Sequence, residues 1–411
     1  MRRSMHSIHL VPSAAGRPIA IATLLALALL GVAVSARGDS GGAIQVRGLV
    51  DLVATDVGDY RYLNTTNTND GNFDALRARL FVDGKRGNTS VYIQFLVSPE
   101  SYSEFRFFGG YIMQRIHEDR NIFIEAGLIP VHDGIWASHT YSNKNPLIGI
   151  PLQQYWKSSL PYTMMPNNLD DLLSKRGQSQ VDGVTYADSN GTRGYRYAGM
   201  PVMYDNCWNY GAFALGTLGR LEFSLGITLG PPSATVQGAD INESLSPHAK
   251  LGYAFTPGLK VWASFARGAY LDRAVAPYLP VGATVNDYNQ DLYGLSVDWK
   301  IWKLWFMGEY FYNQYDTPIR QDGLSNQSFY VQSVYSMVPG WDLCLRYDAL
   351  IFGEVEDSAG NAMTWDENVY RVESGVGYHV SRDLVVKGVA QMTSYRGDWD
   401  LIPAIQASFG F

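Results

Sequence analysis

Residues 44–54 read Ile44-Gln45-Val46-Arg47-Gly48-Leu49-Val50-Asp51-Leu52-Val53-Ala54. Every even-numbered position holds an apolar residue or glycine, whereas Gln45, Arg47 and Asp51 have the other parity. Because successive side chains of a β-strand point to opposite faces, this period of two predicts a strand with one apolar and one polar face. A length of about ten residues is that of a tilted strand that crosses a membrane.

The same alternation recurs to the end of the chain. Further segments with this period are residues 76–83, 91–98, 221–229, 341–348 and 383–392. One such strand also fits a soluble sheet, whose apolar face meets a core. The connections, however, alternate between seven short turns and eight longer polar loops, among them residues 315–326 and 394–399. This asymmetry predicts an all-β fold, a transmembrane antiparallel β-barrel of about 16 strands with both chain ends on the periplasmic, short-turn side.

The first 36 residues predict a secretory signal peptide. The basic residues Arg2, Arg3 and Arg17 precede an apolar run over residues 19–34. Val34-Ser35-Ala36 then provides a small-residue cleavage site. The alternative is a retained membrane anchor, but the run is shorter than the roughly 18 apolar residues that indicate a spanning helix. We therefore treat residues 37–411 as the mature barrel chain.

The composition favours a barrel over an exported soluble enzyme. Beyond residue 36 no unbroken apolar stretch approaches the length of a membrane-spanning helix. Charged residues make up 17% of the sequence, against about 25% in soluble domains, and aromatic residues make up 13%. Removal of the signal peptide leaves 29 of the 32 Lys and Arg residues against 39 Asp and Glu. This negative balance argues against a nucleic-acid partner.

The sequence predicts neither a cofactor nor an enzyme. The chain has no Cys-x-x-Cys-His sequence, so it carries no covalently attached haem of its own. His132, Asp133 and His139 lie close together in the sequence, but a Ser-His-Asp site is recognised by geometry and not by spacing. We expect these residues in a polar loop near the pore mouth rather than in a hydrolase. Cys207 and Cys344 leave one disulfide open in an oxidising periplasm.

One connection, residues 130–206, is far longer than the others. Its prolines discourage a regular sheet, and they are Pro130, Pro146, Pro151, Pro161, Pro166 and Pro201. Its aromatic residues include Trp136, Tyr141, Tyr155, Trp156 and Tyr162. Because disordered segments lack aromatic residues, we expect an ordered and functional loop. It follows the fifth predicted strand and is therefore the third outer loop.

The last strand ends in Phe411. Ile405, Ala407, Phe409 and Phe411 share the face that we expect to contact outer-membrane lipid. A C-terminal Phe that closes an alternating strand resembles the signal read by the barrel-assembly machinery of Gram-negative bacteria. We therefore expect that machinery to be a partner of the chain through Phe411.

Several short stretches resemble the phosphate-selective porin family and its wider porin relatives. They are Gln45-Val46-Arg47-Gly48, Arg77-Ala78-Arg79, Glu125-Ala126-Gly127, Leu221-Glu222-Phe223-Ser224-Leu225-Gly226-Ile227-Thr228 and the closing Phe411. The resemblance covers most of the mature chain. It implies an outer-membrane porin, a passive diffusion channel for small polar or charged solutes. It also implies a third outer loop folded into the lumen and a homotrimer.

Charged residues on the polar faces of the predicted strands are expected to line the pore. They are the basic Arg47, Arg77, Arg79, Lys250, Lys260, Lys303, Arg346, Arg371 and Lys387 and the acidic Asp51, Asp83, Glu125, Glu222, Glu309, Asp342, Asp348, Glu373 and Asp383. The two signs cancel. The lysine ladder of the phosphate-selective members cannot be traced residue by residue, so phosphate selectivity is not carried over.

Two interpretations remain open for this polar face. Arg77 and Arg79 point the same way on one strand and would form a cationic wall opposite acidic residues, whose transverse field would orient solutes. Alternatively, the lumen residues only satisfy one another and water. A second candidate function is the barrel sheath of an outer-membrane porin–cytochrome electron conduit. A sheath needs a wide lumen, which an inward-folded loop would block.

Overall fold

The computed structural model describes residues 42–55, 75–97, 106–117, 120–130, 132–178, 186, 199–203, 208–233 and 242–411. The predicted signal peptide, residues 1–36, lies outside these ranges, and so does Cys207. Cys344 is a free, buried thiol. In the described part of the chain no helix is long and apolar enough to cross a membrane.

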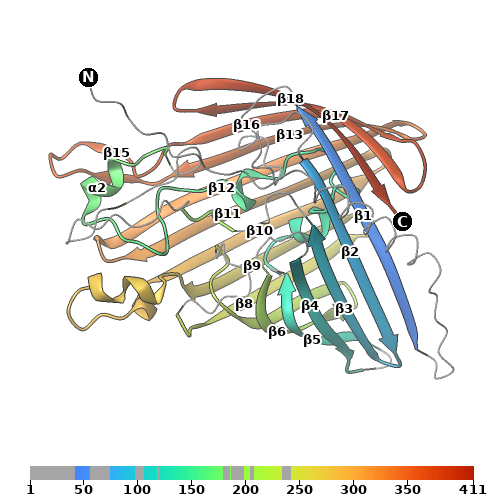
Figure 1. Cartoon of the computed structure of the whole chain (residues 1–411), viewed down its shortest axis with the longest axis horizontal. Helices are drawn as coiled ribbons and strands as arrows, with labels where there is room; N and C mark the ends of the chain where they lie inside the picture. The colour runs from blue at the N-terminus through green and yellow to red at the C-terminus, as the bar shows by residue number, and fades with distance from the viewer. Residues whose placement is uncertain are drawn as a thin grey trace, which may run out of the picture.

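Sixteen strands form one closed antiparallel barrel, as the alternation predicts (Figure 1). They are β1 (Ala43–Thr55), β2 (Ala75–Arg86), β3 (Thr89–Val97), β4 (Arg106–Arg115), β5 (Asn121–Pro130), β6 (Trp208–Leu218), β7 (Leu221–Leu229), β8 (Leu245–Thr256), β9 (Leu259–Ala269), β10 (Asn289–Ile301), β11 (Leu304–Thr317), β12 (Arg320–Val338), β13 (Trp341–Phe352), β16 (Val369–His379), β17 (Leu384–Tyr395) and β18 (Asp398–Gly410). β18 pairs with both β17 and β1, and this second pairing closes the barrel.

The other elements are short and belong to connections. They are a hairpin of β14 (Glu354–Glu356) and β15 (Ala362–Thr364), the helix α2 (Leu169–Leu173) and the 3-10 turns η3 (Trp136–His139), η4 (Leu152–Gln154), η5 (Arg273–Tyr278) and η6 (Val285–Asp287). Figure 1 shows α2 and β15 at one end of the barrel and the C-terminus at the other. The C-terminus lies at the end formed by the tight turns, which we call the short-turn end.

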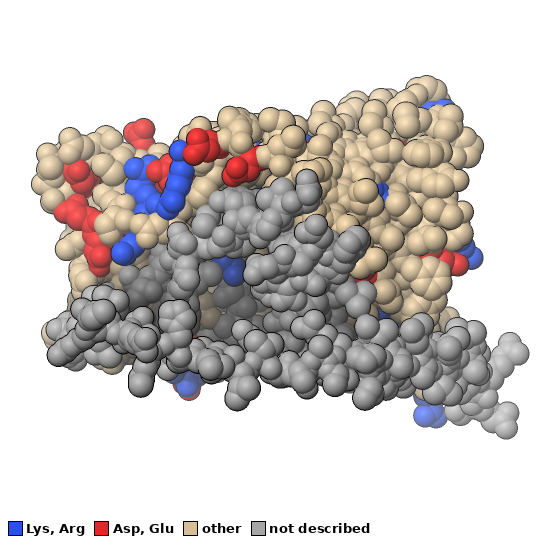
Figure 2. Space-filling view, turned by 45° about the horizontal axis from the view of Figure 1, so that its top comes forward, with Lys and Arg blue, Asp and Glu red and all other residues tan. Residues whose placement is uncertain are grey.

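The two faces of each strand differ as predicted. Outward positions carry exposed apolar side chains, for example Leu225, Leu251, Leu295 and Leu345, each more than half exposed. The alternate positions are polar and buried, among them Ser224, Ser264, Ser296, Gln332, Gln391 and Gln406. In the part of the face in Figure 2 that is not drawn in grey, charged residues gather toward one end, and much of the remaining wall is free of them. An apolar exterior on a closed barrel is the surface that a lipid bilayer requires.

Two connections were predicted to be long loops, and both predictions are wrong. β11 and β12 continue through residues 315–326, with Tyr315 paired to Leu324 and Thr317 to Arg320, so only residues 318–319 turn the chain. This outer extension contains many polar residues on both faces, which hides the period of two. β17 and β18 are joined by Arg396 and Gly397 alone, both with positive φ, the geometry of a type I′ hairpin turn.

Phe411 completes the seam between the first and last strands. Its backbone N–H donates to the carbonyl of Gly48 at 3.0 Å, and the Gly48 N–H donates to the carbonyl of Phe411 at 2.8 Å. The Phe411 ring covers Gly48, where any side chain would collide with it, and stacks on Phe409 with 5.7 Å between ring centroids. Glycine at position 48 therefore provides the space that the terminal ring fills.

We predict that Phe411→Ala weakens the seam. Loss of the ring exposes the surface over Gly48 and should lower the free energy of unfolding by about 1–3 kcal/mol. Reversible denaturation in lipid vesicles measures this. The matched control is Ile405→Ala, which removes an apolar side chain from the same face of β18 without uncovering a glycine. Equal losses in the two variants would contradict a special role for Phe411.

Candidate functional site

The long connection between β5 and β6 enters the barrel. Its longest described segment, residues 132–178, bonds to side chains of β1, β8, β11, β13, β16 and β17 that occupy the inner, polar positions. A closed barrel has one interior, so bonds to inner positions of strands on many sides place this segment in the lumen. We call residues 132–178 the lumenal loop.

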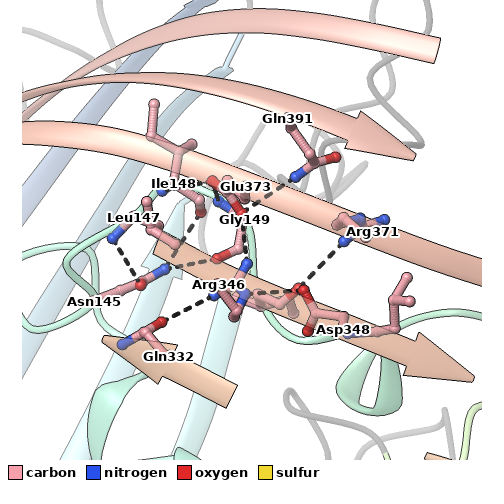
Figure 3. A network of polar contacts seen from close by, with 12 residues as sticks. Asn145, Leu147, Ile148, Gly149, Gln332, Arg346, Asp348, Arg371, Glu373 and Gln391 are labelled. Carbon is pink, nitrogen blue, oxygen red and sulfur yellow. Dashed lines mark hydrogen bonds and ion pairs between the residues drawn. The ribbon is translucent and has the colours of Figure 1, made fainter. Parts of the chain in front are cut away.

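A buried ionic network on β13 and β16 holds one stretch of the lumenal loop (Figure 3). Arg346 donates to Asp348 at 3.1 Å and to Glu373 at 2.5 Å, and all three side chains are at most 1% exposed. The other oxygen of Glu373 accepts the backbone N–H groups of Ile148 and Gly149 at 3.2 and 2.8 Å. Removing one partner of a buried ion pair costs several kcal/mol because it leaves the other charge buried without a partner. The two backbone N–H groups of the loop are therefore part of what stabilises the buried Glu373 carboxylate.

Neighbouring groups extend the same network along the loop. Arg371 donates to the carbonyl of Ile150 at 3.4 Å and to Thr393 at 3.1 Å. Asp348 also accepts the backbone N–H of Leu152 at 3.4 Å. The inner wall therefore binds the loop mainly through loop backbone, which fixes the path of the chain and leaves the loop side chains available for other contacts.

Lys387 on β17 forms the most concentrated contact. Its Nζ donates to the carbonyl oxygens of Ser142, Asn145 and Leu147 at 2.6, 2.8 and 3.0 Å, and the residue is 2% exposed. These three bonds use all three donors of an ammonium group. On the adjoining wall the Asp51 carboxylate accepts from the Ser142 hydroxyl. Together these contacts set the position of the loop tip.

Glu309 on β11 binds the start of the loop. It accepts the backbone N–H groups of Ile135 and Trp136, the latter at 3.3 Å, and the amide of Gln153 at 2.9 Å. Gly134 lies against the Glu309 carboxylate with a φ of +71°, where a side chain would collide with that carboxylate. Lys250 on β8 donates to the carbonyl of Gly134 at 2.8 Å, so Gly134 is held from two walls.

Two histidine contacts complete this side of the wall. His132 lies 3.2 Å from Glu125, and His248 lies 2.7 Å from Asp133 and 2.8 Å from the Thr228 hydroxyl. The order Asp133, His248, Thr228 resembles an acid–base–hydroxyl relay. The Thr228 hydroxyl donates to the carbonyl of Gly230 at 3.1 Å, and all three residues of the relay are buried. The contact ties the loop to β7 and β8.

Toward the outer end, the loop packs into an apolar core. Leu152, Trp156 and Leu172 of the loop belong to a buried cluster that includes Phe311 and Trp365. Side chains of the loop therefore occupy part of the outer lumen.

Asp366, between β15 and β16, links this core to the outer loops. It accepts the backbone N–H groups of Ser159 and Gly177 at 2.6 and 2.7 Å. Burial raises the pKa of Asp366 to about 6, against the opposing effect of these backbone donors.

At the short-turn end the lumen holds a cavity of about 1420 Å³. Seven basic and three acidic side chains are among the described residues that line it, and they are Arg47, Arg79, Lys144, Lys250, Lys260, Lys300, Arg382, Glu222, Asp298 and Asp383. His139 also lines the cavity, and burial lowers its pKa from the usual value. The lumenal loop borders this cavity with residues 137–141, 143 and 144.

Most of the residues predicted to line the pore fall into two groups. Those that contact or support the lumenal loop are Asp51, Glu125, Glu309, Arg346, Asp348, Arg371, Glu373 and Lys387, all nearly fully buried. Those that line the cavity are Arg47, Arg79, Lys250, Lys260, Glu222 and Asp383, of which Lys250 also contacts the loop. Asp83, Lys303 and Asp342 belong to neither group; Lys303 donates to the carbonyl of Met337, and Asp342 accepts from the Ser336 hydroxyl. Arg47 pairs with Asp83 and Lys260 with Glu222, both at 2.5 Å. Arg77 is opposite Asp51 in the register of β1 and β2, and its side chain lies outside the described part.

Sequence reasoning missed the cavity residues that the loop supplies. Tyr141 and Lys144 lie in a segment without a regular period, so no pattern assigns them a face. Lys300 is the first residue of a short turn predicted over residues 300–302, where a charged side chain is ordinary. His248 and Thr228 lie on strands at inner positions, and only the fold brings them to Asp133.

We predict that Lys387→Met releases the loop tip. Methionine keeps the apolar stem but leaves three buried carbonyl oxygens without their donor, each at a cost of about 1–3 kcal/mol. Trypsin added to the folded, detergent-solubilised barrel should then cleave after Lys144, which mass spectrometry detects. Lys85→Met, at an exposed position of β2, is the control. A Lys387→Met barrel that resists trypsin as the wild type does would show that the three bonds do not hold the tip.

No protein-family model matches the sequence, and no curated protein matches it either. Solved structures match across nearly the whole barrel. An anion-selective porin from Comamonas acidovorans is 12% identical with a TM-score of 0.55, and covers 90% of this chain and 100% of its own. A loop L8 deletion mutant of OmpT, an outer membrane protein of Vibrio cholerae, has 12% identity, a TM-score of 0.54 and the same coverage.

A third similar structure is OmpF of Salmonella typhi in complex with daunomycin. It is 10% identical with a TM-score of 0.54, and the match covers 91% of this chain and 99% of that chain. At such low identity the likeness concerns the fold alone. The chain therefore has the 16-stranded barrel fold of bacterial outer-membrane porins, and its apolar exterior agrees with a location in the outer membrane.

Proposed function

We propose that this chain is a passive diffusion channel for small polar or charged solutes. The observation that carries the proposal is the division of the lumen: a loop bound to the inner wall by buried charges stands over a charge-lined cavity at the short-turn end. A loop in this position narrows the path to a constriction, and charged walls there act on solutes through their field.

The cavity charges support a preference for anions. The sequence places equal numbers of acidic and basic residues on the inner faces, and residues of both signs bind the loop, for example Glu373 and Lys387. The basic excess at the cavity comes from three further residues, Lys144, Lys300 and Arg382. Basic side chains therefore outnumber acidic ones in the described lining of the cavity. This excess of cations around the cavity favours anions as a class. No separate observation supports the finer phosphate selectivity of the family that the sequence resembles.

The alternative function, a sheath around a cytochrome, is less well supported. A sheath requires a lumen that a haem protein can enter, whereas here loop residues such as Trp136, Leu152 and Trp156 are buried between the walls.

We retain the homotrimer, the outer-membrane lipid and the assembly machinery acting through Phe411 as parts of the proposal. Cross-linking of the native membrane protein and assembly of a chain without Phe411 test the first and the last.

Purified protein in planar bilayers tests the channel function. We expect discrete conductance steps and a reversal potential that indicates anion preference in a salt gradient. The double variant Lys144→Glu, Lys300→Glu should move the reversal potential toward cation preference, because both side chains are exposed at the cavity. Lys85→Glu, outside the cavity lining, is the control for charge alone. An absence of conductance steps would contradict the proposed function.

A further inference from the structure

We propose that the cavity preferentially binds solutes that carry an aromatic ring together with an anionic group, with aromatic carboxylates as the simplest members. The inference rests on the proposed channel function and names the class of solute that the cavity selects. It comes from one wall of the cavity, where aromatic rings and guanidinium groups are in direct contact. We call this surface, formed by Phe81, Tyr92, Phe108, Tyr111, Tyr141 and Trp208, the aromatic wall.

Three rings of the aromatic wall stack across strands. Tyr92 on β3 lies opposite Tyr111 on β4, with 5.1 Å between ring centroids and 27° between their planes. Tyr92 also stacks on Trp208 of β6 at 6.1 Å and 19°. Trp208 reaches across Gly109, whose missing side chain leaves the room for the indole. Tyr92 and Tyr111 remain partly exposed, so ring surface is open to a solute in the cavity.

Cations lie within the same wall. The Arg79 guanidinium carbon is 5.4 Å from the Phe108 ring centroid and 5.0 Å from that of Tyr141. The Arg47 guanidinium carbon is 5.7 Å from the Phe81 ring, and more than half of the Arg47 side chain is exposed. Phe81 in turn meets Tyr141 edge-on at 5.4 Å. Arg79 is buried at 5% exposure, so a solute at this wall meets ring faces beside the exposed Arg47 guanidinium and within the field of Arg79.

The lumenal loop makes this arrangement possible. Tyr141 is a loop residue, and its hydroxyl donates to Gln94 of β3 at 3.0 Å. The adjacent Ser142 is held by Asp51 through its hydroxyl and by Lys387 through its carbonyl. These anchors fix Tyr141 over Arg79 and leave Lys144 exposed at the cavity. The wall is thus preorganised, which reduces the ordering cost of binding.

The chemistry of the wall favours aromatic anions over two simpler classes. A small inorganic anion would use the positive charges but gain nothing from the stacked rings. A neutral sugar would use ring faces, but an excess of cations gives it no charge attraction. Stacking of one aromatic pair tightens binding roughly two- to tenfold beyond the effect of burial. A ring-bearing anion gains both contributions, so it should bind more tightly than either class.

Competition with chloride current in planar bilayers tests this inference. We expect benzoate to reduce the chloride current at a concentration roughly two- to tenfold lower than cyclohexanecarboxylate, which has the same charge without the aromatic ring. Acetate, phosphate and glucose should be weaker still. Tyr111→Leu should abolish the advantage of benzoate over cyclohexanecarboxylate. Tyr253→Leu, which removes an exposed outward-facing tyrosine of β8, should leave that advantage unchanged.

A binding measurement separates failure of this inference from failure of the channel function. Saturation-transfer NMR of the detergent-solubilised barrel detects benzoate and cyclohexanecarboxylate without any current. Equal binding of the two carboxylates, or tighter binding of phosphate or glucose, would overturn the inference even if the protein conducts. Preferential benzoate binding that Tyr111→Leu removes would support the site even if no conductance were seen. If Tyr111→Leu fails to fold, Tyr92→Leu replaces it.

Discussion

Everything inside this barrel depends on how buried charges on the inner wall are satisfied. Glu373 is fully buried, and its carboxylate accepts from Arg346 of the neighbouring strand and from two backbone N–H groups of the lumenal loop. Lys387 gives all its donors to loop carbonyl groups. Buried ions without partners are very costly, so wall and loop need each other. The barrel encloses the loop, and the loop completes the barrel interior.

This dependence divides the lumen into two regions with different properties. In the outer region, loop residues such as Trp156 pack with Phe311 and Trp365 in an apolar core. At the short-turn end, the loop tip roofs a cavity lined mainly by basic side chains. The same anchors that hold the loop therefore also decide which charges face solutes. A change at an anchor would alter the cavity without touching its lining, which links the stability of the loop to permeation.

The sequence predicts the barrel well because the period of two is a local property. The outward Leu225 and Leu345 and the inward Lys387 and Glu373 lie on the faces that alternation assigns. The pattern fails where strands leave the membrane, as in residues 315–326, because both faces of the hairpin are polar there. It also fails for the site. Glu309 and Lys260 look equivalent in sequence, yet one binds loop backbone and the other lines the cavity, and only the path of an aperiodic loop distinguishes them.

Hydrogen–deuterium exchange of the folded wild-type protein tests the central claim most directly. The account predicts that the amides of Ile148 and Gly149, which donate to the buried Glu373 carboxylate, exchange as slowly as amides within the barrel strands. Exposed loop amides that donate no hydrogen bond within the described part of the chain, such as that of Val281 between η5 and η6, should exchange much faster. Exchange of Ile148 and Gly149 at the rate of Val281 would show that the loop is not held by the wall, and would contradict the account.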